Sequence, residues 1–177
     1  MGLVYIASAT ASSSATLSFT TGIDATYNEY QFHFANMHPA TTNQTFDFQV
    51  NAAGASGFNE TITSSAVQAF HTEDDAYQGF GYHAAIDQAQ GTAYQILTTG
   101  VGNDNDLGAS GILTLYAPSS TTYVKHFTAR VQAASSVGSV EKYIGGYINV
   151  TAAIDEISFK FASGNIDAGE IHMYGVG

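Results

Sequence analysis

Alternation of apolar and polar side chains near the end of the chain constrains its fold more than any other feature. Residues 143–151, 153–161 and 163–175 each place Ile, Phe, Val, Met or Tyr at every second position over much of their length. A period of two is typical of strands that bury one face. We therefore expect three closing strands whose core side chains are Ile157, Phe159, Phe161, Ile171 and Met173. The side chains expected to face outward or toward a partner are Glu156, Ser158, Lys160, Glu170 and His172.

Similar segments recur along the rest of the chain, between turn-forming residues. Two of them stop at or before a proline, Pro39 and Pro118, because proline cannot donate to a sheet ladder. Residues 64–70 have a second interpretation as one or two helical turns, but no convincing amphipathic helix occurs elsewhere. The further strands are expected at residues 3–9, 16–20, 29–37, 45–51, 66–72, 79–86, 93–99, 111–117 and 123–133.

Short strands separated by turn signals favour a sandwich or a jelly roll over an α/β fold. We predict an all-β protein, an antiparallel β-sandwich of jelly-roll-like form with about eight to ten strands. A length of 177 residues fits one domain, so residues 1–177 are assigned to a single β-sandwich. A domain of this size buries roughly 70% of its unfolded surface, so it can fold without a disulfide or a metal.

The charge balance excludes several classes of partner. Four basic residues stand against fifteen acidic ones, which gives a net charge of −11. Nucleic-acid binding needs clustered Lys and Arg, and so does binding to an anionic membrane. We therefore expect neither partner. The N-terminal residues lack the basic and apolar regions of a signal peptide, which favours synthesis in a cytoplasm.

The small number of charges favours a protein that packs against neighbours. Charged residues make up 11% of the chain, against about 25% in typical soluble domains. A surface of Ser, Thr, Asn and Gln suits an assembly, where each buried charge would need a partner. A secreted β-domain of similar composition is the alternative. Few basic residues protect exposed strand edges, so we hypothesise that a homo-oligomer covers them.

No motif for nucleophilic catalysis or phosphate binding is found, and we predict no catalytic or cofactor-binding residue. Residues 103–108 read Asn-Asp-Asn-Asp-Leu-Gly and resemble the start of a calcium loop. An EF-hand would need glutamate at its twelfth position, where Thr114 or Leu115 stands. Asp104 and Asp106 are candidates for a simpler calcium site, the alternative being a solvated turn. The acidic run at residues 73–75 is interpreted as a solvated loop.

The remaining candidate functional residues are histidines and tyrosines. His33, His126 and His172 occupy alternating strand positions beside aromatics, which indicates surface or interface side chains, with a metal site across strands as the alternative. Five tyrosines near loops or strand ends could serve protein interfaces or sugar stacking, although core packing is the commoner role for any one of them. These are Tyr27, Tyr77, Tyr82, Tyr94 and Tyr123.

Several blocks of the chain resemble small virion structural proteins of tailed bacteriophages, the capsid decoration and tail-associated β-sandwich proteins. The blocks are residues 22–32, 115–125, 145–157 and 174–175. The resemblance implies a β-sandwich module of a phage particle, and no functional residue is carried over from it.

On this basis we expect a non-enzymatic virion protein, made in the host cytoplasm, which acts as a capsid decoration or cement protein. Its expected partners are its own copies, as a homotrimer, and the major capsid protein or tail proteins. The first alternative is a tail or fibre component that contacts host-surface glycans as an adaptor or tip. The second is an extracellular carbohydrate-binding or hydrolytic β-domain.

Overall fold

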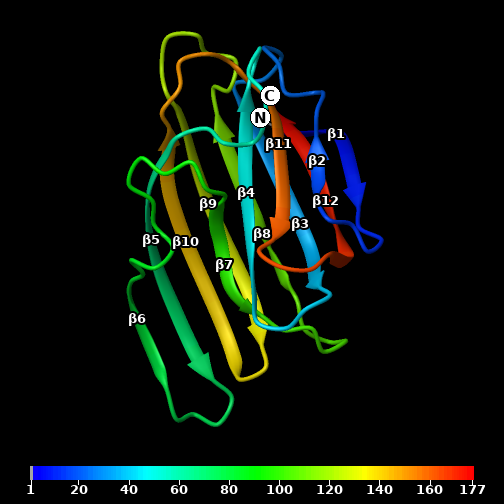
Figure 1. The fold of residues 1–177 in the computed structure, drawn as a ribbon, viewed down its shortest axis with the longest axis vertical. Helices are drawn as coiled ribbons and strands as arrows, with labels where there is room; N and C mark the ends of the chain where they lie inside the picture. The colour runs from blue at the N-terminus through cyan, green and yellow to red at the C-terminus, as the bar shows by residue number, and fades with distance from the viewer. Residues whose placement is uncertain (1) are drawn as a thin grey trace.

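Two antiparallel sheets packed face to face form the protein (Figure 1). The computed structural model describes residues 2–177, and within them every regular element is a strand. The larger sheet has eight strands in the order β1 (Leu3–Thr10), β12 (Ile166–Val176), β3 (Glu29–Pro39), β8 (Ala109–Tyr116), β9 (Lys125–Ser135), β10 (Gly138–Ile148), β5 (Ile62–Thr72) and β6 (Gln78–Tyr82). The smaller has four, in the order β2 (Leu17–Phe19), β11 (Ile154–Phe161), β4 (Gln44–Ala52) and β7 (Gln95–Val101).

The predicted all-β antiparallel sandwich is confirmed. Each segment expected to be a strand contains one, so the estimate of about eight to ten strands was too low, and the structure has twelve. A jelly roll usually has eight strands, whereas here the sheets have eight and four, so the jelly-roll arrangement is not confirmed. Residues 64–70 lie in β5, which rules out the helical alternative there. No helix within residues 2–177 is long and apolar enough to cross a membrane.

The inner faces of both sheets meet in a core rich in phenylalanine. Phe46 of the small sheet stacks on Phe159, with ring centroids 6.0 Å apart and planes 14° apart. Phe48 meets Phe127 of the large sheet edge to face at 5.1 Å. The five core residues predicted for the closing strands are all buried. Alternating side chains on β9 and β11 thus fill the space between the sheets, as their period of two requires.

The outer face of the small sheet is also covered, which the sequence pattern did not predict. Ser158 was expected to face outward, yet it is 1% exposed and bonds Ser18 at 2.9 Å. On the neighbouring strand, Gln49 is fully buried and its amide donates to the carbonyl groups of Glu60, Thr92 and Ala93. Loops from two distant parts of the chain therefore close over this polar face. The prediction for Ser158 was wrong because alternation shows which face is polar but not whether loops cover it.

Two lysines are fully buried in the sandwich. Lys125 donates hydrogen bonds of 3.0–3.1 Å to the carbonyl groups of Tyr123, Val150 and Thr151. This ammonium joins the segment before β9 to the segment after β10. Lys142 bonds Gln68 and the His83 ring, and burial lowers the pKa of Lys142 to about 8.

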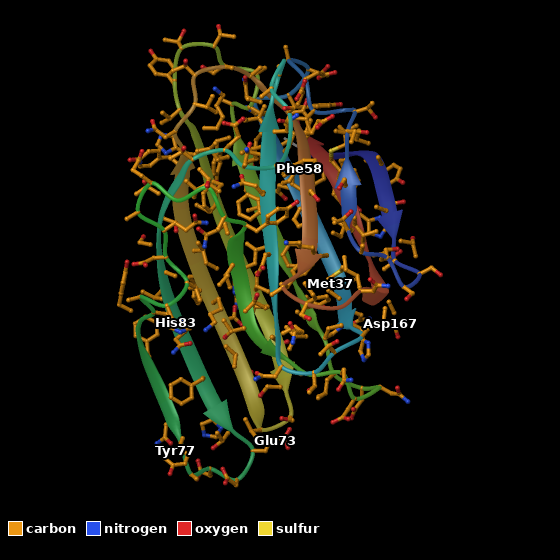
Figure 2. The ribbon with its side chains drawn as sticks, viewed as in Figure 1. Met37, Phe58, Glu73, Tyr77, His83 and Asp167 are labelled. Atoms are coloured by element: carbon orange, nitrogen blue, oxygen red, sulfur yellow. The ribbon has the colours of Figure 1, made fainter. Side chains whose placement is uncertain are left out.

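The β5–β6 hairpin extends beyond the small sheet at one corner of the molecule (Figure 1). Tyr77 and Glu73 lie at its tip, and His83 lies where the chain leaves β6 (Figure 2). β6 is one of the two edge strands of the large sheet, and β1 is the other. The chain termini lie together at the other end, where Gly2 and Gly177 exchange backbone hydrogen bonds.

Candidate interaction surface

The outer face of the eight-stranded sheet carries a continuous row of mainly aromatic, imidazole and apolar side chains. Directly opposed residues of antiparallel neighbours point to the same face, so the strand register defines the row. It crosses all eight strands through Ser8, His172, His33, Ile112, Arg130, Tyr143, Val67 and Tyr82. We call this set the aromatic row. Arg130 is its one permanently charged member.

Several large side chains of this face are strongly exposed. Phe80, next to the row on β6, is 75% exposed, and Tyr82 is 59% exposed. Ile112 and Tyr143, near the centre of the sheet, are 39% and 41% exposed. Single exposed apolar residues are ordinary, but a contiguous set of them marks an interaction site.

A groove of about 490 Å³ runs beside the aromatic row. The small side chains of Ser65, Thr114 and Thr128 line it together with Gly145, and these four residues are opposed to one another across the strands. A Cβ added to Gly145 would meet no atom within 4 Å, so the space above this glycine is open. The groove exists because short side chains follow one row of the pleat while long ones follow the next.

Long side chains of the aromatic row form one wall of this groove. The Arg130 guanidinium lies 5.4 Å from the centre of the Tyr143 ring, and its Nε donates to Glu141 at 2.5 Å. That ion pair raises the pKa of Arg130. The Tyr82 hydroxyl bonds the Asp87 carboxylate, which raises the pKa of Tyr82. Both contacts orient side chains of the wall, and the Arg130 guanidinium lies over one face of the Tyr143 ring.

The three histidines singled out from the sequence all project from this outer face. His33 and His172 are directly opposed on β3 and β12, and His33 Nε2 donates a 2.9 Å hydrogen bond to Gln31 Oε1. Partial burial, together with the nearby His172, lowers the pKa of His33. His126 is exposed on β9 with its ring centroid 6.4 Å from that of Tyr147. Within residues 2–177, no three His, Asp or Glu side chains gather as a metal site.

The calcium candidates lie in the loop before β8. The backbone N–H of Leu107 donates to the Asp104 carbonyl, which closes a turn, and the same carbonyl is 3.2 Å from His38 Nε2. Asp106 lines a polar pocket of about 540 Å³ to which Asp167 also contributes. Asp106 and Asp167 thus line the same pocket, but within the described residues Asp104 and Asp106 do not gather with a third acidic ligand.

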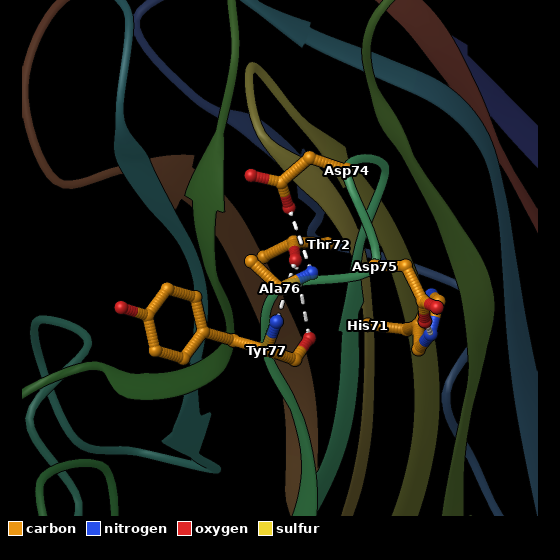
Figure 3. A network of polar contacts seen from close by, with 6 residues as sticks. All are labelled: His71, Thr72, Asp74, Asp75, Ala76 and Tyr77. Atoms are coloured by element: carbon orange, nitrogen blue, oxygen red, sulfur yellow. Dashed lines mark hydrogen bonds and ion pairs between the residues drawn. The ribbon is translucent and has the colours of Figure 1, made fainter.

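The acidic run at residues 73–75 forms the turn of the β5–β6 hairpin (Figure 3). Asp74 accepts a 3.1 Å hydrogen bond from the backbone of Ala76, and Asp75 pairs with His71 at 3.0 Å. Hydrogen bonds from Thr72 and the Ala76 backbone lower the pKa of Asp74. These acidic side chains are exposed and bonded within the turn, as expected for a solvated loop.

The five tyrosines proposed from the sequence divide into two groups. Tyr77, Tyr82 and Tyr123 are 59–73% exposed. Tyr27 packs against Tyr30, with centroids 5.8 Å apart, and Tyr94 lies under the Lys160 ammonium at 4.4 Å. The sequence reasoning missed the contribution of Phe80, Ile112 and Tyr143 to the outer face, because each lies inside a strand where a core position was the simpler interpretation. The register of the strands is the signal that groups them.

Neither a scan against models of protein families nor a search of curated proteins found a match for this chain.

Proposed function

We propose that this chain is a non-enzymatic structural protein of a virion, a capsid decoration or cement protein, which binds its neighbours through the outer face of the eight-stranded sheet. The observation that carries the proposal is the aromatic row, with exposed Ile112 and Tyr143 near the middle of the sheet. Interfaces are enriched in Tyr, Phe and Arg, and charge is depleted at their centres. The composition of the row matches that description.

The low charge of the whole chain supports an assembly role in the same way. A surface that must be buried against protein neighbours favours hydroxyl and amide side chains, because each unpaired buried charge is costly. Burying the row would also remove Tyr143 and Ile112 from water, at a gain of roughly 25 cal/mol per Å² of apolar area. A shell whose subunits are held by such contacts is stabilised by mass action.

The location and copy number of the chain on purified phage particles test this proposal. We expect many copies distributed over the head, and particles that lack the protein should lose resistance to heat. A few copies at one vertex would instead indicate a tail component. Unchanged heat resistance of particles without the protein would contradict a cement role.

A specific observation favours a second candidate, a tail or fibre component that binds a host glycan. The groove beside the aromatic row combines tyrosine faces with the hydroxyl groups of Ser65 and Thr128. Aromatic rings stack on the apolar faces of sugars, and hydroxyl groups bond their edges.

A glycan array tests this candidate with one informative variant. Gly145→Phe places a large ring into the groove at a position where the added Cβ meets nothing. A glycan that binds the wild-type chain and is lost with Gly145→Phe would support this function. Absence of any glycan ligand would leave the protein–protein role as the better account.

A further inference from the structure

The four free sheet edges differ in how well they are protected against pairing with another strand. Exposed edges are normally blunted by bulges, short length, charge or proline. β1 is interrupted by a register shift between Tyr5 and Ala7, and β7 pairs with β4 through two such shifts. β2 is only three residues long. β6 pairs with β5 without a register shift, and its sequence Gln-Gly-Phe-Gly-Tyr contains neither charge nor proline.

The hydrogen-bond pattern shows which backbone groups of β6 face the free edge. His83 N–H donates to the Ala66 carbonyl at one end of the hairpin, and the Tyr77 carbonyl accepts from Thr72 N–H at the other. Bonded and non-bonded pairs alternate along an antiparallel ladder. The N–H and C=O groups of Gln78, Phe80 and Tyr82 therefore point away from β5, and no other strand of residues 2–177 pairs with them.

This edge is self-complementary. We infer that β6 pairs antiparallel with β6 of a second copy of this chain, about a two-fold axis at Phe80. In that register Phe80 lies opposite its own copy and Gln78 lies opposite Tyr82. Each of these pairs is of the hydrogen-bonded kind, so the six outward N–H and C=O groups of each copy are all satisfied. A continuous sheet crosses the contact.

The side chains and the charge of β6 also favour a second copy of this chain as its partner. Phe80 meets its counterpart across the axis on the outer face, where it is otherwise 75% exposed. Gly79 and Gly81 alternate with it, so β6 itself places no side chain on its opposite face, where the Phe70 ring of β5 lies over Gly79. Each copy carries −11, and an uncharged edge is where two such copies approach with least repulsion. When the register is continued, the acidic turn at residues 73–75 of one copy lies beside residues 85–87 of the other, so Glu73 faces Asp87 and adds to the repulsion that salt would screen.

The contact does not depend on the virion role, and it is small. Five residues from each copy bury less surface area than a standard protein–protein interface does. We therefore expect a weak dimer that dissociates at concentrations on the order of 10–100 µM. Because repulsion between the acidic copies opposes it, the dimer should strengthen as salt is added.

Sedimentation equilibrium of the purified chain tests the stoichiometry. A monomer–dimer equilibrium is expected, and Phe80→Lys should weaken it at least ~10-fold because it brings two ammonium groups together at the axis. Phe80→Pro removes only an outward N–H and should act in the same direction. The matched control is Leu3→Lys on the β1 edge, which should leave the dimer unchanged. A trimer, a monomer at all concentrations, or a dimer insensitive to Phe80→Lys would overturn the inference.

Disulfide trapping tests the register, because the chain has no cysteine of its own. In the proposed pairing the two copies of residue 80 have Cα atoms about 5.5 Å apart, within the range for a disulfide. Under mild oxidation Phe80→Cys should therefore form a covalent dimer. Gln78→Cys alone should not, whereas Gln78→Cys mixed with Tyr82→Cys should. Equal trapping of Gln78→Cys and Phe80→Cys alone would contradict the two-fold register.

Discussion

Asp47 is a buried carboxylic acid on β4 of the small sheet. It is 5% exposed, and its Oδ1 has no hydrogen-bond partner within the described residues. Burial raises the pKa of Asp47 from 3.8 to about 7, although Lys160 on the neighbouring strand partly opposes the change. Because the folded state binds this proton more tightly than the unfolded state, its stabilising effect is complete below about pH 4 and is lost as the pH rises to about 7.

Asp47→Asn should therefore reduce the pH dependence of stability. The pKa difference corresponds to at most about 4 kcal/mol in the free energy of unfolding. We therefore expect the free energy of unfolding of the variant to rise by about 2 kcal/mol relative to that of the wild type between pH 4 and pH 8. Urea unfolding at a series of pH values measures this gain. Asp167→Asn, which changes an exposed residue, is the control. An identical pH profile for wild type and Asp47→Asn would show that Asp47 titrates normally.

Lys125 is a second residue whose burial makes a definite prediction. Its side chain is fully buried, and its ammonium donates to three carbonyl groups. Lys125→Met keeps much of the volume but leaves those acceptors unpaired, so we expect a loss of about 3 kcal/mol in the free energy of unfolding. Chemical denaturation measures this loss. Lys160→Met is the control, and its free energy of unfolding should fall by less than about 1 kcal/mol. Equal losses of stability in the two variants would mean that the three hydrogen bonds of Lys125 contribute little to the stability of the fold.

At the scale of the strand, β10 offers adjacent glycines with opposite surroundings. A Cβ on Gly146 would lie 2.6 Å from the Thr63 carbonyl oxygen and 2.8 Å from the Phe127 ring, whereas a Cβ on Gly145 would meet nothing within 4 Å. Gly146→Ala should therefore destabilise the fold by about 2 kcal/mol or more, through strain in a packed core. Gly145→Ala should be neutral or slightly stabilising. Thermal unfolding of the pair provides the comparison, and similar melting temperatures would contradict the packing described for β10.

Strand alternation predicted the elements well where one face meets the core and the other meets solvent. On β9, a period of two places Lys125, Phe127, Ala129 and Val131 on one face, and all four are buried. The pattern failed on β11 and β4, where Ser158 and Gln49 are buried on the second face by loops. Those loops come from residues close to 60 and 92, far away in the sequence, so no local period could reveal them.

The candidate surface could be predicted only in part for the same reason. His33 and His172 were identified from their alternating positions, and Tyr82 from its place near a turn. The aromatic row itself depends on the order β12-β3-β8-β9-β10-β5, which sets residues far apart in the chain side by side. Strand order is a property of the whole fold, and it could not be derived from one sequence.

At the scale of the whole molecule, the centre of the outer face of the eight-stranded sheet and the β6 edge are neighbouring contact regions, and Tyr82 belongs to both. The first would bind a different protein surface, and the second a copy of the chain. Variants can separate them, because Gly145 and Phe80 lie on different strands and neither supports the core. We expect Gly145→Phe to leave self-association unchanged and Phe80→Lys to leave binding through the centre of the sheet largely intact. Loss of both activities in either variant would indicate one shared interface.

We propose that the outer face of the large sheet binds the particle. Cosedimentation of the purified chain with phage heads that lack it measures this directly. Wild type and Tyr123→Ala, which alters an exposed tyrosine outside the aromatic row, should bind to saturation, while Gly145→Phe and Tyr143→Ser should lose at least ~10-fold in affinity. Binding of all four chains with equal affinity, or no binding of the wild type, would contradict the account.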